Sequence, residues 1–224
     1  MVDRKLIVRD RIIGALLRDA RRRAGRTRAE CADALGVSKD TIEAYEEGRT
    51  PISLPELEVL GYVVGIPMHR FWEGEPELES VDEAHPDFRT VLDLRHRIVG
   101  TLLRQTRLEA DVTREGLARV LGCSPARVAD YEHSEKPIPV SELELLAEHL
   151  DLPLERFVDG QGGMVGEWHR RQEIDRRFRE LPEDMQEFVA DPNNAGYVEV
   201  AMRLSELPLN SLRAVAEGLL AIAH

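Results

Sequence analysis

The sequence predicts an all-helical protein in which one five-helix unit occurs twice and is followed by a smaller helical region. Leu, Ala, Arg and Glu are abundant and aromatic residues make up 5% of the 224 residues, a composition that favours helices over sheets. Residues 12–74 align without gaps with residues 98–160, and 25 of the 63 aligned positions are identical. Apolar residues within each copy recur at helical spacing. The chain therefore contains an internal duplication with an offset of 86 residues.

The first helix of the unit is predicted to be amphipathic and to end near Gly25. Its apolar positions are Ile12, Ile13, Leu16, Leu17 and Ala20, and its outer face carries Arg18, Arg21, Arg22 and Arg23. Thr27 and Glu30 fit a capping box, which predicts a short second helix from Arg28 to Leu35. Gly36 is expected to end that helix in a left-handed conformation.

Ser38 is expected to cap the third helix, in which Ile42 and Tyr45 point inward. The outward positions of this helix are Lys39, Asp40, Thr41, Glu43 and Ala44. A second capping box at Ser53–Glu56 predicts a fourth helix, and Pro67–Trp72 predicts a last short helical turn. A short helix, a turn and a second helix that begins on a capping serine form the pattern of a helix-turn-helix. The second copy repeats this pattern at Leu121–Glu132.

The pattern divides the chain into four segments. Residues 9–74 and 93–160 are the two copies, residues 75–92 are an acidic linker, and residues 161–224 are a C-terminal helical region. In the last region, Gln161–Met164 is predicted to be a flexible junction and Trp168–Glu180 a charged helix with a solvated face. Further helices are predicted at about Ala195–Ser205 and Asn210–Ala223. Because the last helix is too short to bury its broad apolar face alone, it is expected to pack on its own repeats or to form a homodimer.

The repeated motif resembles the XRE or lambda-repressor-like helix-turn-helix family. The resemblance rests on Leu17-Arg18-x-x-Arg21, on Gly25-x-Thr27-Arg28-x-Glu30-x-Ala32-x-x-Leu35-Gly36-Val37-Ser38, and on Ile42-x-x-Tyr45-Glu46-x-Gly48 with Pro51. It covers residues 11–72 and, more loosely, residues 97–158. The resemblance implies two tandem five-helix domains that bind double-stranded DNA, with the third helix of each in the major groove.

The same resemblance implies which residues contact DNA. In the first copy they are Arg28, Ser38, Lys39, Asp40, Thr41, Ala44 and Arg49, and in the second copy Arg114, Ser124, Ala126, Arg127 and Lys136. Arginine at positions 28 and 114 has guanine or phosphate as its natural partner. Unpaired N–H groups at the helix N-termini also suit phosphate binding. The implied function is a sequence-specific transcriptional regulator, and one chain would imitate the dimer of a single-domain repressor.

The charge distribution leaves an alternative function open. The net charge is −12, although residues 1–30 carry ten Arg or Lys against four acidic residues. The third helix itself carries Asp40, Glu43, Glu46 and Glu47, and only Glu46, which matches the family motif, is expected to be structural. Carboxylates near a phosphate backbone are repulsive. One or both copies could therefore belong to a non-catalytic protein-interaction or antitoxin-like protein that retains the fold.

Sequence patterns for other functions are missing. No catalytic motif, cofactor-binding motif or metal-ligand spacing is found, so we expect neither an enzyme nor a bound cofactor or metal. Cys31 and Cys123 align with Leu117 and Val37, which indicates that both cysteines pack as small apolar residues. No apolar run is long enough to span a membrane, and the protein is expected to be cytoplasmic.

Overall fold

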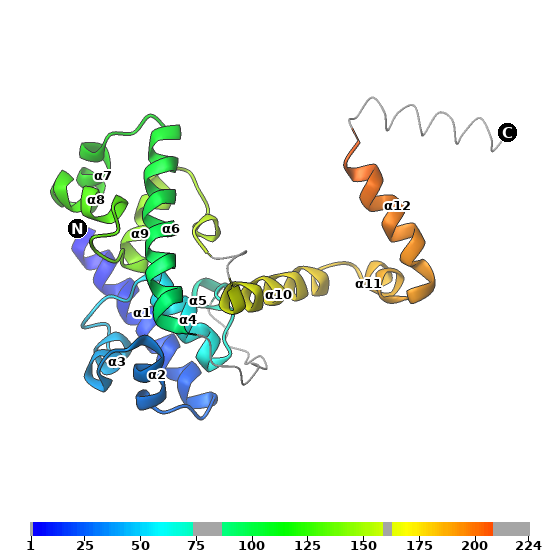
Figure 1. The fold of residues 1–224 in the computed structure, drawn as a ribbon, viewed down its shortest axis with the longest axis horizontal. Coiled ribbons are helices and arrows are strands. Elements are labelled where there is room, and N and C mark those ends of the chain that lie inside the picture. The colour runs from blue at the N-terminus through cyan, green and yellow to red at the C-terminus, as the bar shows by residue number, and fades with distance from the viewer. Residues whose placement is uncertain (1, 74–86, 159–162, 208–224) are drawn as a thin grey trace. The chain divides into compact units, whose positions relative to one another are not determined.

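The computed structural model describes residues 2–73, 87–158 and 163–207 (Figure 1). These ranges are helical and contain no strand, which confirms the all-helical fold class. The chain divides into two units, Met1–Glu173 and Ile174–His224, and each is described by itself. None of the described helices combines the length and the apolar composition that a membrane crossing requires.

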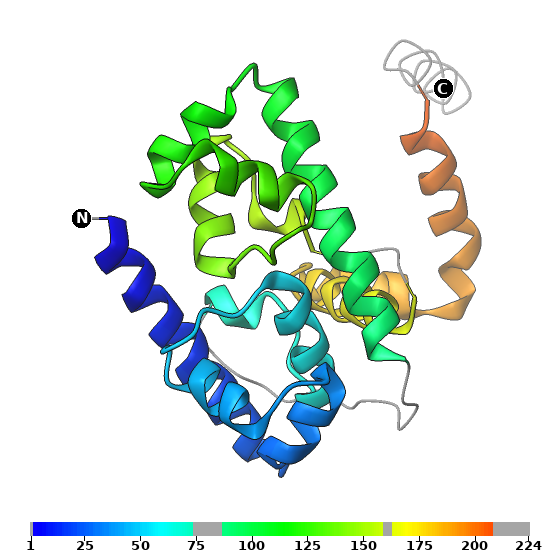
Figure 2. The same cartoon turned by 60° about the vertical axis from the view of Figure 1, so that its left-hand side comes forward.

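The two copies of the repeat form most of the first unit (Figure 2). The first copy contains α1 (Val2–Arg23), α2 (Arg28–Leu35), α3 (Lys39–Glu46), α4 (Leu54–Val64) and α5 (Arg70–Glu73). The second contains α6 (Phe88–Glu109), α7 (Arg114–Leu121), α8 (Pro125–Glu132), α9 (Val140–His149) and the 3-10 helix η1 (Leu154–Arg156). Helix α1 begins before residue 9, and α6 begins inside the predicted linker, of which residues 75–86 lie outside the described part.

The predicted caps fix the ends of the short helices. The Thr27 side chain accepts a hydrogen bond from the Glu30 N–H, while the Glu30 carboxylate accepts from the Thr27 N–H, so the capping box is confirmed. Gly36 ends α2 with a φ of 67°, and Ser38 caps α3 by accepting from the Thr41 N–H. In the second copy Thr113 and Ser124 cap α7 and α8. These local contacts place both helix-turn-helix motifs where the sequence predicts them.

Three left-handed positions differ between the copies. Gly25, Gly48 and Gly65 have positive φ in the first copy, and their counterparts in the second are Asp111, Ser134 and Asp151. These three residues keep φ values of 54°, 60° and 56°. The backbone path has thus been retained at positions where a side chain makes it less favourable.

The two copies contact each other through equivalent residues. Arg9 of α1 donates hydrogen bonds to Glu144 of α9, and Arg95 of α6 donates to Glu58 of α4. Both pairs are related by the 86-residue offset of the repeat. An exchange of equivalent contacts is the property of an interface with a two-fold axis. The copies are therefore related by an approximate two-fold axis within one chain.

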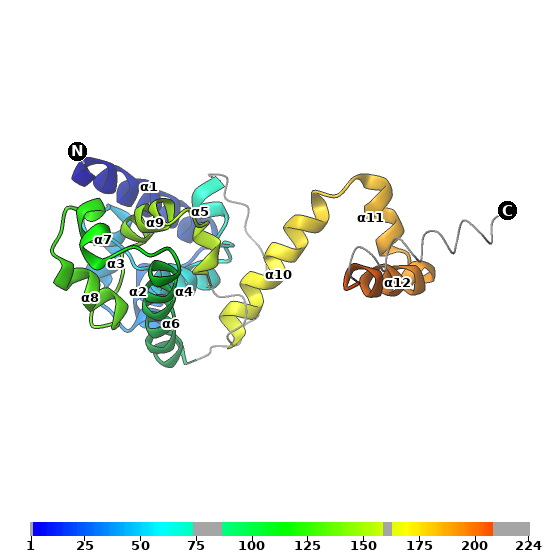
Figure 3. The same cartoon turned by 90° about the horizontal axis from the view of Figure 1, so that it is seen from above.

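The approximate two-fold relationship also holds for the helices that carry these ion pairs. Helix α1 packs on α9 and helix α4 packs on α6 (Figure 3). Between these helix pairs, an isolated antiparallel bridge joins Ser53 to Pro139, which are also equivalent residues. The Val140 N–H donates to the Ile52 carbonyl at 2.8 Å beside this bridge. The segments that follow α3 and α8 thus meet at the contact between the copies.

Helix α10 (Gly163–Arg179) begins earlier than predicted, and its first half belongs to the first unit. Val165 and Trp168 are buried against Tyr62 of α4, and the Trp168 and Tyr62 rings meet edge to face at 5.7 Å. His169, expected on a solvated face, is 5% exposed, and its Nε2 atom lies 2.9 Å from the Glu58 carbonyl. The prediction of a solvated face is wrong here because the aromatic side chains add this part of α10 to the core.

The described part of the second unit consists of short helices. They are α11 (Glu183–Ala190), the 3-10 helix η2 (Pro192–Asn194) and α12 (Ala195–Ser205). Helix α12 has the predicted bounds, and the predicted helix at Asn210–Ala223 lies outside the described residues. Neither α11 nor α12 has a buried residue.

Candidate nucleic-acid interface

Helix α3 is held in place by a buried ionic cluster. Glu46, at the end of α3, is 2% exposed and accepts hydrogen bonds from Arg21 of α1 and from Arg28 of α2. Burial alone would raise the pKa of Glu46, but the hydrogen bonds from the two arginines outweigh it and lower the pKa. Arg21 was expected on the outer face of α1, and this expectation is wrong because Arg21 neutralises Glu46 inside the fold.

The second copy contains the same cluster. Glu132, which is 4% exposed, accepts hydrogen bonds from Arg107 at 2.5 Å and from Arg114 at 2.8 Å. Burial opposes the ionisation of Glu132, and the two arginines again lower its pKa. Each cluster therefore connects the first three helices of its copy and fixes the orientation of the helix that follows the turn.

Arg28 and Arg114 begin α2 and α7, where DNA contacts were predicted. Both are partly buried and turn toward the glutamate at the end of the next helix. Arg28 also pairs with Glu43, and its pKa is raised, first by the hydrogen bond to Glu46. These arginines serve the fold, and the guanidinium groups have only part of their surface available to a ligand.

The outward side chains of α3 begin at its N-terminus. Lys39 and Asp40 are exposed, and Thr41 is half-buried with its Oγ1 atom 2.9 Å from the Ser38 Oγ. Among the described residues Lys39 has no carboxylate partner. Ala44, predicted to face outward, is 8% exposed, because the segment after α3 folds back and the N–H groups of residues 49 and 50 donate to its carbonyl. The prediction of an exposed Ala44 is therefore wrong.

The acidic side chains of α3 have cationic neighbours. Arg49, predicted to meet DNA, lies with its Nε atom 2.5 Å from Glu47 and its Nη2 atom 3.9 Å from Glu43. Glu43 also pairs with Arg28. Three of the four carboxylates on or next to α3 are thus neutralised by arginines of the same copy, which reduces the repulsion expected from the sequence.

Helix α8 presents a different surface. Ser124 and Ala126 are exposed at its start, as the sequence predicts for residues that face outward. Arg127 turns back along the helix, donating to the Tyr131 hydroxyl at 2.8 Å and to Glu142 at 2.5 Å. Lys136 pairs with Asp130 at 2.6 Å, and its side chain remains 61% exposed. Both cations of this surface, Arg127 and Lys136, are thus bound to acids of the same copy.

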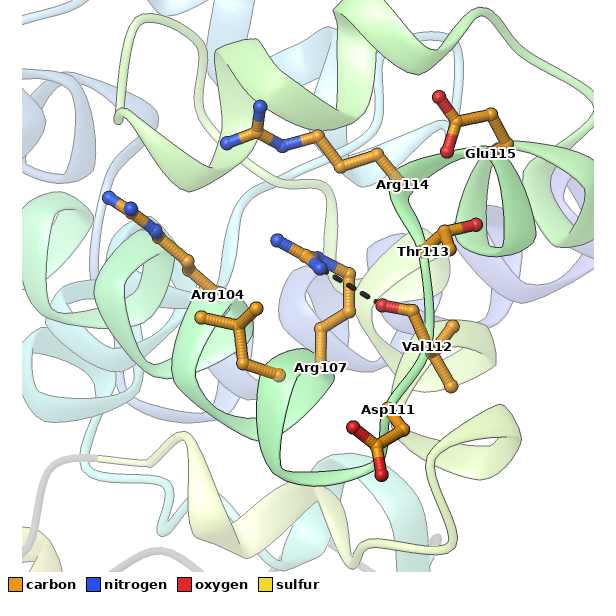
Figure 4. A pocket seen from close by; sticks show the side chains of 8 residues that line it. Arg104, Arg107, Asp111, Val112, Thr113, Arg114 and Glu115 are labelled. Atoms are coloured by element: carbon orange, nitrogen blue, oxygen red, sulfur yellow. Dashed lines mark hydrogen bonds between the residues drawn. The ribbon is translucent and has the colours of Figure 1, made fainter.

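A shallow pocket of about 470 Å³ lies between the end of α6 and the start of α7. Figure 4 shows the side chains of Arg104, Arg107 and Arg114 around it, with Arg107 donating to the Val112 carbonyl at 2.9 Å. Thr113, the N-cap of α7, lines the same pocket. Asp111 and Glu115 also line the pocket, and Arg107 and Arg114 already pair with Glu132. Arg104 and the N–H groups at the start of α7 are therefore the parts of the pocket suited to an anion such as a phosphate.

The sequence-based prediction missed Arg104. It is exposed, lines the pocket, and forms no ion pair with any residue that the structure describes. The repeat contains a signal for this residue. Both copies have arginine at the equivalent positions 18 and 104, although each position lies on the polar side of the first helix of its copy.

Within residues 2–73, 87–158 and 163–207, no three His, Cys, Asp or Glu side chains form a metal-binding group.

The two cysteines are buried to different extents. Cys31 is 1% exposed, and burial raises the pKa of its thiol to about 11, so it packs as the sequence predicts. Cys123 lies in the turn before α8 and is only partly buried, although burial also raises its pKa.

The comparisons with known proteins agree with this geometry. A family model for the helix-turn-helix domain matches the chain twice, at residues 12–69 and 98–157. The two matches cover more than half of the chain and coincide with the two copies of the repeat. No match was found among curated proteins or among solved structures.

Proposed function

We propose, from the premise that this chain belongs to the helix-turn-helix domain family, that it is a transcriptional regulator that binds double-stranded DNA in a sequence-specific manner. The observation that carries the proposal is the exchange of equivalent ion pairs, Arg9 with Glu144 and Arg95 with Glu58. It relates α3 and α8 by an approximate two-fold axis. Helix-turn-helix dimers use such symmetry to place two helices in successive major grooves.

The exposed cations supply the electrostatic part of the proposed binding. Lys39 at the start of α3 and Arg104 beside the α7 N-terminus have no carboxylate partner in the part of the chain that the structure describes. Arg49 and Lys136 would exchange exposed ion pairs for phosphate contacts, which costs little because such pairs are weak in water. A negative net charge restricts non-specific attraction and leaves binding dependent on these local contacts.

The test is binding of the full chain to genomic DNA fragments over a series of salt concentrations. The affinity should fall steeply with salt, Arg104→Ala should reduce the slope of log K against log salt by about 0.9, and Lys39→Ala should lower the affinity. Arg203→Ala is the matched control, because Arg203 lies on α12 with a highly exposed side chain. A folded chain that binds no DNA at low salt would contradict the proposal.

A second candidate function is a non-catalytic interaction protein of the antitoxin-like kind. It is favoured by the pairing of Arg28, Arg49, Arg114, Arg127 and Lys136 with acids of the same chain. The salt series separates the two functions. An interaction protein would show no DNA binding at any salt concentration, whereas a regulator would lose binding only as salt rises.

We also propose that two chains form a homodimer through the second unit. Its described residues expose large apolar side chains, namely Ile174, Leu181, Met185, Phe188, Val189, Tyr197, Val200, Met202 and Leu207. Phe188 of α11 and Tyr197 of α12 are in ring contact at 6.3 Å, so both helices contribute to one apolar surface.

A second copy fits this surface because its charges are self-complementary. Basic residues gather at the end of α10 and acidic residues at the start of α11, so an antiparallel arrangement would place opposite charges together. Analytical ultracentrifugation should show a dimer, and Phe188→Asp with Tyr197→Asp should give a monomer. Glu199→Gln on the same helix is the control, and a monomeric unaltered chain at micromolar concentration would contradict the dimer.

A further inference from the structure

The approximate two-fold axis places unlike side chains in equivalent positions of α3 and α8. Lys39, Asp40 and Thr41 form the first turn of α3, and Pro125, Ala126 and Arg127 form the first turn of α8. The fold, the N-cap serine and the buried glutamate are the same in both copies. The two helices thus share their supporting contacts but differ at all three positions of the turn that would enter the major groove.

Helix α3 offers side chains that can distinguish base pairs. The exposed Lys39 ammonium can donate to O6 and N7 of guanine. The exposed Asp40 carboxylate can accept from N4 of cytosine. Both groups are at the N-terminal end of α3, which is the end that contacts base edges in helix-turn-helix complexes.

Helix α8 offers much less at the same place. Pro125 and Ala126 have no side-chain donor or acceptor. Arg127 is bound to Tyr131 and Glu142, and its guanidinium carbon lies 5.5 Å from the centre of the Tyr131 ring. In the first copy the equivalent tyrosine, Tyr45, donates to Glu56, and Thr41 stands at the position of Arg127. The arginine that could read bases in the second copy is thus held by its own helix and by α9.

The second copy nevertheless keeps a site for the DNA backbone. At the α7 N-terminus, Arg104 lines the pocket without an ion pair among the described residues, whereas Arg107 and Arg114 pair with Glu132 and the carboxylates of Asp111 and Glu115 lie nearby. Phosphate contacts of this kind position a protein on DNA but carry no sequence information by themselves. The second copy therefore has the means to hold a half-site and few means to select it.

We propose that the operator is asymmetric and that one chain binds it in a single orientation. This inference rests on the proposed DNA-binding function. Helix α3 reads a half-site that contains G·C base pairs through Lys39 and Asp40, whereas α8 lies on a half-site that tolerates many sequences and is held through its backbone.

The first experiment selects DNA bound by the full chain from a random pool and compares the sequence preference of the two half-sites. The expected result is one half-site with defined G·C pairs and a second, poorly defined half-site one helical turn away. Enrichment of an inverted repeat with equal preference in both halves would overturn the asymmetric operator and leave the DNA-binding function intact. Absence of any enrichment would overturn sequence-specific binding itself, together with this inference.

Two variants test the assignment to residues. In the half-site read by α3, Lys39→Ala should reduce discrimination against a changed G·C pair roughly tenfold. Base changes in the second half-site should have the same small effect on binding by the variant as on binding by the unaltered chain. Unchanged discrimination in Lys39→Ala would overturn the role of α3.

The triple variant Pro125→Lys, Ala126→Asp, Arg127→Thr gives α8 the first turn of α3. It should bind an inverted repeat of the selected half-site roughly tenfold more tightly than the unaltered chain does. A triple variant that melts like the unaltered chain and still favours the asymmetric site would overturn the proposal. If it melts early, the result of Lys39→Ala on the surface of α3 decides alone.

Discussion

Arg95 donates two hydrogen bonds to Glu58 across the contact between the two copies, at 2.9 and 2.7 Å, and a third to the Phe157 carbonyl at 2.7 Å. The side chains of the pair are only 5% and 1% exposed. The equivalent pair, Arg9 with Glu144, is 24% and 23% exposed. The chain thus contains two versions of one ion pair that differ mainly in burial.

The first prediction compares these two pairs. Arg95→Met should lower the free energy of unfolding by about 3–5 kcal/mol, because it removes two charge-assisted hydrogen bonds from the buried Glu58 carboxylate. Arg9→Met should cost about 1 kcal/mol or less, because water can replace the lost partner. Denaturant unfolding followed by circular dichroism measures both. Equal effects of the two substitutions would show that burial does not determine the strength of this contact.

The second prediction concerns Glu43, whose carboxylate pairs with Arg28 and lies near Arg49. Glu43→Gln removes a negative charge from α3 and one of the two carboxylate neighbours of Arg28 and of Arg49, while Glu46 and Glu47 still pair with them. DNA affinity should rise roughly three- to tenfold, and the slope of log K against log salt should steepen by about one. Glu187→Gln on α11 is the control for net charge, and an equal gain in that variant would rule out a local effect at α3.

The third prediction concerns Asp151, which has a φ of 56° where the first copy has Gly65. Asp151→Gly should raise the free energy of unfolding by about 0.5–1 kcal/mol, because glycine adopts this conformation without steric cost. Thermal unfolding measures the effect. The reverse substitution, Gly65→Asp, should lower stability, and stabilisation in that variant would disprove the conformational explanation.

The fourth prediction concerns His96 of α6. Burial lowers its pKa, with Arg95 acting in the same direction and the carboxylates of Glu56 and Asp93 opposing them. Because the folded pKa lies below the unfolded value of about 6.5, the unfolded chain binds the proton more readily. The stabilising contribution is therefore present above pH 6.5 and is lost as pH falls through the folded pKa.

The free energy of unfolding should accordingly decline between pH 7 and pH 5, and His96→Gln should reduce that decline. His133, which is exposed at the end of α8, provides the matched control as His133→Gln. The same pH dependence in the unaltered chain and in His96→Gln would exclude His96 as its cause.

The repeat and its short helices could be predicted from the sequence because their signals are local. Thr27 and Glu30 are three residues apart, and Gly36 and Ser38 directly flank the turn, so the bounds of α2 and α3 follow from nearby hydrogen bonds. Arg21 was misplaced because its partner, Glu46, is 25 residues away. Helical periodicity shows that a side chain is polar, but it does not reveal a distant carboxylate that buries it.

The contact between the copies could not be predicted either, because its ion pairs join residues that are far apart in the sequence. Arg9 and Arg95 are identical, as are Glu58 and Glu144, but each arginine pairs with the glutamate of the other copy. Identity at equivalent positions indicates a shared role without showing which copy supplies the partner. In α10, Trp168 and His169 are surrounded in sequence by charged residues, and their packing on Tyr62 and Glu58 depends on the tertiary fold.

The two copies that meet at the bridge between Ser53 and Pro139 belong to one polypeptide, which has a consequence for how the proposed DNA binding depends on protein concentration. Two separate chains must meet before they can present a pair of reading helices, so their occupancy of a site depends on the square of concentration when dimers are scarce. Here a single polypeptide brings both helices at once. For binding by one chain, promoter occupancy would then rise in direct proportion to the amount of protein at low abundance, and a cell with a few molecules would already have working copies.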